Sequence, residues 1–184
     1  MTVKPDHWII EMGKKGMMEP FAAESVRGGI SFGPSAYGYD FRLGREFKRA
    51  IVRPGLVMDP KADASQYFED FVGDICEIPA RGFVLGRSLE YFRIPRNILA
   101  ITFGKSTYAR SGIHLNVTPA EPEWEGYLTI AIHNHNSIPA RIYAGEGIGQ
   151  MVFLEAKELC QNSYADKKGK YQGQKEITVA KGRG

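Results

Sequence analysis

Cysteine, long apolar runs and a strong charge of one sign are all scarce in this chain of 184 residues. Its two cysteines, Cys76 and Cys160, lie far apart and in no metal-ligand spacing, which indicates two buried thiols in a reducing compartment. No stretch approaches the roughly eighteen apolar residues that cross a bilayer, and the first residues lack the basic and apolar segments of a signal peptide. We therefore expect a cytoplasmic protein without a membrane partner.

The net charge is small as well, at +3, and the basic residues are scattered along the chain. A groove for a nucleic-acid polymer would usually show a basic stripe with interleaved aromatic residues, so no polymer partner is expected. Scattered cations can still bind a small polyanion such as a triphosphate. The length allows one domain with a single sizeable core.

What the chain does contain is a series of short apolar segments separated by glycine and proline. Tyr39, Phe41 and Leu43 alternate with polar residues, which is typical of a half-buried strand. Further strands, or strand ends, are expected at residues 78–85, 99–103, 127–132, 140–143 and 150–154. Alternating strand–helix units are absent, so we predict a mainly β fold, closed or nearly closed.

Two short helices are predicted within this β-rich pattern. The first begins near the N-terminus, with Asp6 as its cap and with Gly13 and Gly16 at its end. The second follows an apolar strand and runs for one or two turns from Ser106 to Ser111.

The second helix opens with Gly104-Lys105-Ser106-Thr107, which suits a phosphate group. A glycine lets a phosphate approach backbone N–H groups, and the helix end supplies about half a positive charge. The segment is not a Walker loop, because the upstream glycine is absent. Arg110 lies four residues after Ser106, so on a helical turn both point to the same side. A phosphate site is indicated, with an ordinary capped turn as the alternative.

Residues 116–126 add a rigid hairpin, because two prolines and a glycine bracket three acidic residues there. Alone, this hairpin is most simply a solvated turn. Together with the phosphate-type turn, and on the family pattern described next, residues 104–126 form a predicted nucleoside-triphosphate site.

The order of these motifs resembles that of the bacterial dCTP deaminases. The segments that carry the resemblance are 104–112, 116–119 and 121–126, together with 1–11, 18–21, 35–40, 90–96, 163–166 and 169–174. They cover nearly the whole chain.

The resemblance implies a homotrimer of distorted β-barrels of the dUTPase type, with active sites at subunit interfaces. Residues 1–160 would form the single barrel domain, and residues 161–184 a C-terminal arm that closes over the nucleotide. The implied reaction is hydrolytic deamination of dCTP to dUTP and ammonia, with magnesium carried by the phosphates, no zinc, and dTTP as a candidate inhibitor.

Family positions also assign roles to single residues. Ser106 and Arg110 would help to orient the attacking water, and Arg110 would act from a neighbouring subunit. The backbone around Thr129 and Ile130 would read the cytosine edge, and Glu121 would lie near the sugar and base. The remaining positions implied to bind the nucleotide are Lys105, Thr107, Gln150, Tyr164, Lys170 and Gln174.

One position departs from the family pattern. The proton-shuttling glutamate is expected six residues after Glu125, and this chain has Ala131 there. Alanine can neither donate nor accept a proton, and loss of a general acid/base costs on the order of 10²–10⁴ in rate. We therefore expect dCTP binding with poor deamination, either in an engineered variant or after natural loss of the acid.

Several alternatives remain open at this stage. A dUTP pyrophosphatase on the same fold would use an aspartate in the hairpin, where this chain has Glu121. A nucleotide-sensing protein without catalysis would bind dCTP or dTTP and turn over neither, and a β-barrel without a ligand would bind no deoxynucleotide. His133 and His135 lie on one strand face and could pair on a metal, although the sequence shows no third ligand.

Overall fold

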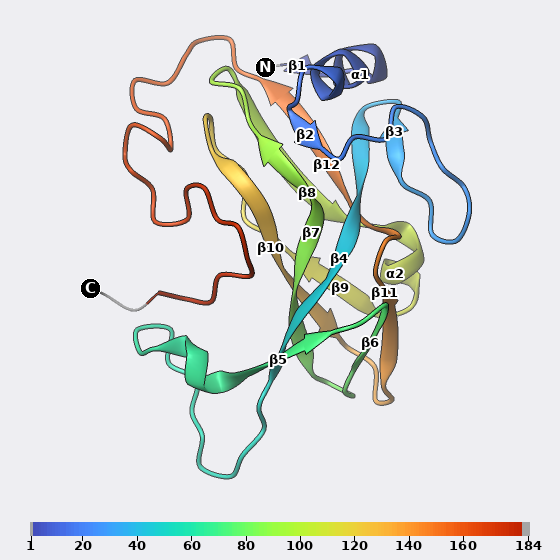
Figure 1. Ribbon diagram of the computed structural model, residues 1–184, viewed down its shortest axis with the longest axis vertical. Helices are drawn as coiled ribbons and strands as arrows, with labels where there is room; N and C mark the ends of the chain where they lie inside the picture. Colours follow the sequence, from blue (N-terminus) through green and yellow to red (C-terminus); the bar gives the residue numbers. More distant parts are fainter. Residues whose placement is uncertain (1, 182–184) are drawn as a thin grey trace.

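The computed structural model describes residues 2–181, and its main feature is a ten-stranded, strongly curled β-sheet (Figure 1). Six strands lie side by side in the order β1, β12, β4, β7, β10, β9, and four more pair along their lengths: β2 on β7, β3 and β5 on β4, and β8 on β12. Strands β6 and β11 form a separate two-stranded ladder. The expected mainly β fold is confirmed.

The strands have the following bounds: β1 Thr2–Val3, β2 Met18–Glu19, β3 Gly33–Ser35, β4 Gly38–Ala50, β5 Phe68–Val72, β6 Ile75–Ile78, β7 Phe83–Arg93, β8 Ile98–Gly104, β9 Ile113–Asn116, β10 Glu125–Asn134, β11 Ala140–Tyr143 and β12 Gly147–Glu155. The helices are α1 Asp6–Lys14, the 3-10 turn η1 Ala64–Tyr67, and α2 Ser106–Arg110. All the strands and both α-helices expected from the sequence are present, while β1, β2, β3, β5 and β9 are additional.

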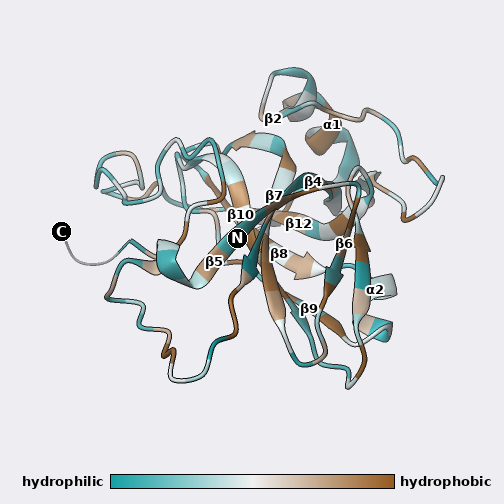
Figure 2. Cartoon of the chain, turned by 60° about the horizontal axis from the view of Figure 1, so that its bottom comes forward, coloured by the Kyte–Doolittle hydropathy of each residue, from teal (hydrophilic) through white to brown (hydrophobic). Residues whose placement is uncertain are grey.

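The sheet forms because its long strands alternate between two environments. In β7 every second residue from Val84 to Phe92 is buried, and β10 alternates in the same way. Successive side chains of a strand point to opposite faces, so one face of each strand builds the core and the other is left for a ligand or partner. The alternation of hydrophobic and hydrophilic residues is visible along the strands in Figure 2. The largest fully buried side chains include Tyr39, Phe41, Phe47, Phe92 and Phe153.

Helix α1 begins one residue earlier than expected. The residue before it is Pro5, and Asp6 is the first helical residue, so the prediction of Asp6 as the cap is wrong. The Asp6 carboxylate accepts a hydrogen bond from the His7 N–H at 2.7 Å, and its charge still complements the positive end of the helix. Gly13 lies in the last turn, and Gly16, with φ of +88°, turns the chain away.

Residues 156–181 contain no regular helix or strand among those described. Figure 1 shows this segment, which we call the arm from residue 161 onward, crossing the side of the sheet near β10, opposite the side that carries α2. An isolated parallel bridge joins Gln174 of the arm to Gly126 at the start of β10. The arm is thereby placed beside the predicted hairpin.

Candidate functional site

The hairpin before β10 and the arm enclose a cavity of about 160 Å³. Four residues to which the sequence assigned nucleotide contacts line it together: Glu121, Thr129, Tyr164 and Gln174. They come from the hairpin, from β10 and from two parts of the arm. The fold thus brings four of the eleven predicted nucleotide-binding residues to one place.

Backbone hydrogen bonds hold the arm against the hairpin. The Tyr164 N–H donates to the carbonyl of Pro122 at 2.9 Å, and the Tyr127 N–H donates to the carbonyl of Gln174 at 3.0 Å. The Trp124 indole N–H donates to the carbonyl of Tyr171, also at 3.0 Å. A backbone group of the arm takes part in each of these three bonds.

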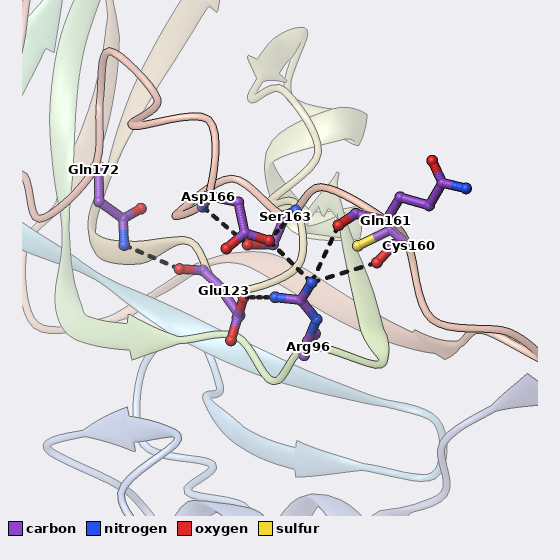
Figure 3. Close-up of polar contacts among 7 residues, drawn as sticks. All are labelled: Arg96, Glu123, Cys160, Gln161, Ser163, Asp166 and Gln172. Carbon is purple, nitrogen blue, oxygen red and sulfur yellow. Dashed lines mark hydrogen bonds and ion pairs between the residues drawn. The ribbon is translucent and has the colours of Figure 1, made fainter.

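A polar cluster around Arg96 fastens the start of the arm (Figure 3). The Arg96 guanidinium lies 2.5 Å from the Glu123 carboxylate of the hairpin and 2.9 Å from the Asp166 carboxylate of the arm. The hydrogen bond from the Ser163 N–H and the charge of Arg96 hold the pKa of Asp166 below its ordinary value. Arg96 therefore ties the hairpin to the arm directly.

Thr129 is the point at which the arm reaches β10. Its hydroxyl oxygen accepts a hydrogen bond from the Thr178 N–H at 3.1 Å and a longer one, at 3.4 Å, from the Gln174 side-chain amide. The Gln174 amide also donates to the carbonyl of Tyr127. The arm thus occupies the Thr129 hydroxyl and the Tyr127 carbonyl, whereas the resemblance assigned the backbone around Thr129 and Ile130 to the base.

Ala131 lies on the same face of β10 as Thr129, two residues further along, and is half-buried. Its partners on the neighbouring strands are Leu85 and Asn116, neither of which is acidic. Ile130, between the two, is fully buried in the core, so only its backbone is available to a ligand. Neither directly paired neighbour of Ala131 can replace a proton-shuttling carboxylate.

The phosphate-type residues form a second group around α2. Lys105 forms an ion pair with Asp40, whose other oxygen accepts a hydrogen bond from the Gln150 amide at 3.0 Å. Ser106, Thr107 and Arg110 are exposed on α2. The Arg110 guanidinium reaches the carbonyl of Ser106 at 3.5 Å, in keeping with a common side of the helix.

The two groups lie far apart within one chain. Arg110 precedes Gly112, whose carbonyl accepts a hydrogen bond from the His135 N–H at 3.0 Å, just beyond the end of β10. At about 3.3 Å per residue, six residues of strand separate His135 from Thr129 by about 20 Å. Lys170 does not line the cavity either; its ammonium donates to the carbonyl of Lys181.

Sequence reasoning gave no individual role to Asp40 or Arg96. Both lie within motifs that carry the family resemblance, yet the sequence shows no reason why either should contact the site. Asp40 acts by pairing with Lys105 and Gln150, and Arg96 by joining hairpin and arm. Such roles follow from long-range contacts that residue spacing does not reveal.

Within residues 2–181, no three His, Cys, Asp or Glu side chains are already grouped so that they could hold a metal ion. No helix in that part of the chain is long and apolar enough to span a membrane.

Known proteins resemble this chain in sequence and in fold. The dCTP deaminase of Bordetella petrii is 52% identical over 184 residues, covering 97% of this chain and 98% of that protein. The dCTP deaminase of Acidithiobacillus ferrooxidans is 52% identical over 187 residues, covering 98% of this chain and all of that protein. The 2'-deoxycytidine 5'-triphosphate deaminase from Agrobacterium tumefaciens has a similar fold, with a TM-score of 0.62 at 16% identity over 82% of this chain and 47% of that longer chain.

The fold and cavity define a class of mainly β proteins in which a hairpin and the C-terminal segment of the same chain enclose a small cavity. A family model described as dCTP deaminase-like matches residues 3–156. The chain belongs to the dCTP deaminase-like family.

Proposed function

We propose that this protein binds dCTP in the arm-covered cavity and deaminates it to dUTP and ammonia only slowly. The observation that carries the proposal is the convergence of Glu121, Thr129, Tyr164 and Gln174 on one cavity, with Ala131 on the same strand face as Thr129. The first four are positions that the family resemblance assigns to the nucleotide. Ala131 is the position of the proton-shuttling acid.

The slow rate follows from the chemistry of deamination. Water must add to C4 of cytosine, N3 must gain a proton, and the amino group must leave protonated. A carboxylate can carry these protons, whereas the methyl group of Ala131 cannot, and its paired neighbours Leu85 and Asn116 supply no acid.

The triphosphate would bind to Lys105, Ser106, Thr107 and Arg110 of a neighbouring copy in a homotrimer. The distance between α2 and the cavity within one chain supports a site shared between copies. A magnesium ion would enter with the phosphates and neutralise their charge, and no zinc would be required.

The experiment restores the acid. We expect the Ala131→Glu variant to release ammonia from dCTP, in the presence of Mg²⁺, about 10²–10⁴ times faster than the chain with Ala131. Ala131→Gln is the matched control. Glutamine has nearly the same size as glutamate but cannot shuttle protons, so deamination by this variant should stay slow. Calorimetry should show dCTP binding to all three proteins.

Ala131 also favours a second candidate function, a nucleotide-binding regulator without catalysis. That function predicts dCTP or dTTP binding with no turnover even in the Ala131→Glu variant. If the chain with Ala131 binds no deoxynucleotide in the presence of magnesium, both candidates fail.

A further inference from the structure

Three of the four histidines gather at the end of β10, away from the arm. His133 is the second-last residue of β10, and His114 of β9 lies directly opposite it in the antiparallel ladder. His135 follows the end of the strand. The ring centroids of His133 and His135 are 6.2 Å apart, and those of His114 and His135 are 6.0 Å apart. The structure thus supplies the third imidazole that the sequence did not reveal.

A ligand from solution can reach the three imidazoles. His114 and His135 are exposed, and His133 is half-buried with its ring stacked on Phe83 at 5.3 Å. Among residues 2–181, no side chain or backbone group forms a hydrogen bond or ion pair with their ring nitrogens. Their lone pairs therefore remain available to a ligand.

We propose that His114, His133 and His135 bind one transition-metal ion of the Zn²⁺, Ni²⁺ or Cu²⁺ type. Neutral imidazole nitrogens are preferred ligands of these ions, and three of them leave a coordination position open for water. This inference does not depend on the proposed function.

The ion would complete the site by drawing the rings together. Ligand nitrogens at about 2.0–2.1 Å from an ion place imidazole centroids roughly 5 Å apart, which is closer than the 6.0 and 6.2 Å of the two ring pairs. The rings therefore have to approach one another and turn their nitrogens toward a common point. Side-chain rotation can supply this movement, because His114 and His135 are exposed and His135 lies beyond the strand. As they stand, the three rings lie near one another without forming a metal site, and an ion would bind only after they turn toward it.

Protons compete with a metal for the imidazole nitrogens, because only the uncharged ring can act as a ligand. Binding of the ion should therefore weaken in acid.

The test is a titration of the purified protein with Co²⁺, followed by visible absorption, and with Zn²⁺ in competition with a chromophoric chelator. We expect one ion per chain and a Co²⁺ spectrum with nitrogen coordination. His114→Gln and His135→Gln should each weaken binding at least tenfold, because even loss of a group that merely orients a ligand costs about 10–100-fold.

His7→Gln is the matched control, since the His7 ring is exposed on α1, beside Asp6. It should leave the affinity unchanged. Both test residues are exposed, and circular dichroism will show whether their variants keep the fold. Zn²⁺ binding weaker than millimolar, equal binding by the double variant His114→Gln/His135→Gln, or loss of binding in His7→Gln would overturn the proposal.

Discussion

The Glu90 side chain has no solvent exposure and forms an ion pair with Arg42, with 2.7 Å between Oε1 and Nε. Its second oxygen accepts a hydrogen bond from the Arg42 N–H at 2.9 Å. Burial raises the pKa of Glu90, and Arg42 acts in the opposite direction. Nearby, burial and the charge of Glu90 raise the pKa of Tyr39 to about 12. The Arg42–Glu90 pair joins β4 to β7 in the core. If one partner is removed, the other is left as an uncompensated charge.

Removing the acid should therefore destabilise the fold. We expect Glu90→Ala to lower the free energy of unfolding by about 3–5 kcal/mol, because the Arg42 guanidinium is left without its partner. Urea unfolding followed by fluorescence measures this difference. Glu11→Ala, which breaks an exposed pair with Lys15, should leave the unfolding midpoint unchanged. A similar midpoint shift in both variants would contradict the buried-pair explanation.

Single residues of the candidate site were predictable to different extents. Ala131 could be located by counting along the chain from the hairpin, because the family pattern specifies that spacing. Its neighbours Leu85 and Asn116 could not, because strand register depends on contacts across the whole sheet. His114 was missed as a third imidazole for the same reason.

At the scale of elements, the arm and the hairpin form one unit. Arg96 contacts Glu123 and Asp166, and backbone bonds continue the contact as far as Gln174. The cavity exists only while this unit is assembled, because its lining comes from both segments.

Arg96→Ala should loosen the arm. We expect faster amide hydrogen exchange at Tyr164 and Gly173, whose N–H groups bond to the hairpin carbonyls of Pro122 and Glu125. Arg141→Ala is the matched control, because Arg141 forms an exposed pair with Glu77 between β11 and β6 and, within residues 2–181, contacts neither the arm nor the hairpin. Equal exchange at the arm amides in both variants would exclude Arg96 as the fastening residue.

Acid should have a related effect through Asp166. Its pKa is lowered in the folded protein by the Ser163 N–H and by Arg96, so its contribution to arm docking is complete above the ordinary value of 3.8. That contribution is lost as the pH falls through the lowered folded value. Trp124 fluorescence should report this step, since its indole donates to the carbonyl of Tyr171 in the arm. In Asp166→Asn the step should disappear.

The elements that were predicted well have a repeating pattern of their own. Residues 99–103 and 127–132 alternate or are continuously apolar, and both lie within the observed strands β8 and β10. The course of the arm could not be derived in this way, because it has no periodicity and is positioned largely by backbone hydrogen bonds. An arm was expected from the family resemblance alone.

At the scale of the whole molecule, the predicted site residues divide between two regions of one chain. Glu121, Thr129 and the arm residues line the cavity, whereas Ser106 and Arg110 lie on α2 beyond the far end of β10. Figure 1 shows α2 and the arm on opposite sides of the sheet. A triphosphate that contacts both groups therefore requires two copies of the chain, with α2 of one copy facing the cavity of another.

Co-expression of two defective chains tests this arrangement. One chain carries Ala131→Glu with Arg110→Ala, and the other is the unaltered chain, which has Arg110 and lacks the acid. If each site takes the acid from one copy and Arg110 from its neighbour, a quarter of the sites in randomly mixed oligomers are complete. We expect about a quarter of the dCTP deamination rate of the Ala131→Glu protein. If each site instead lies within a single chain, no mixed oligomer contains a complete site, and the rate will not exceed the average of the two parent proteins.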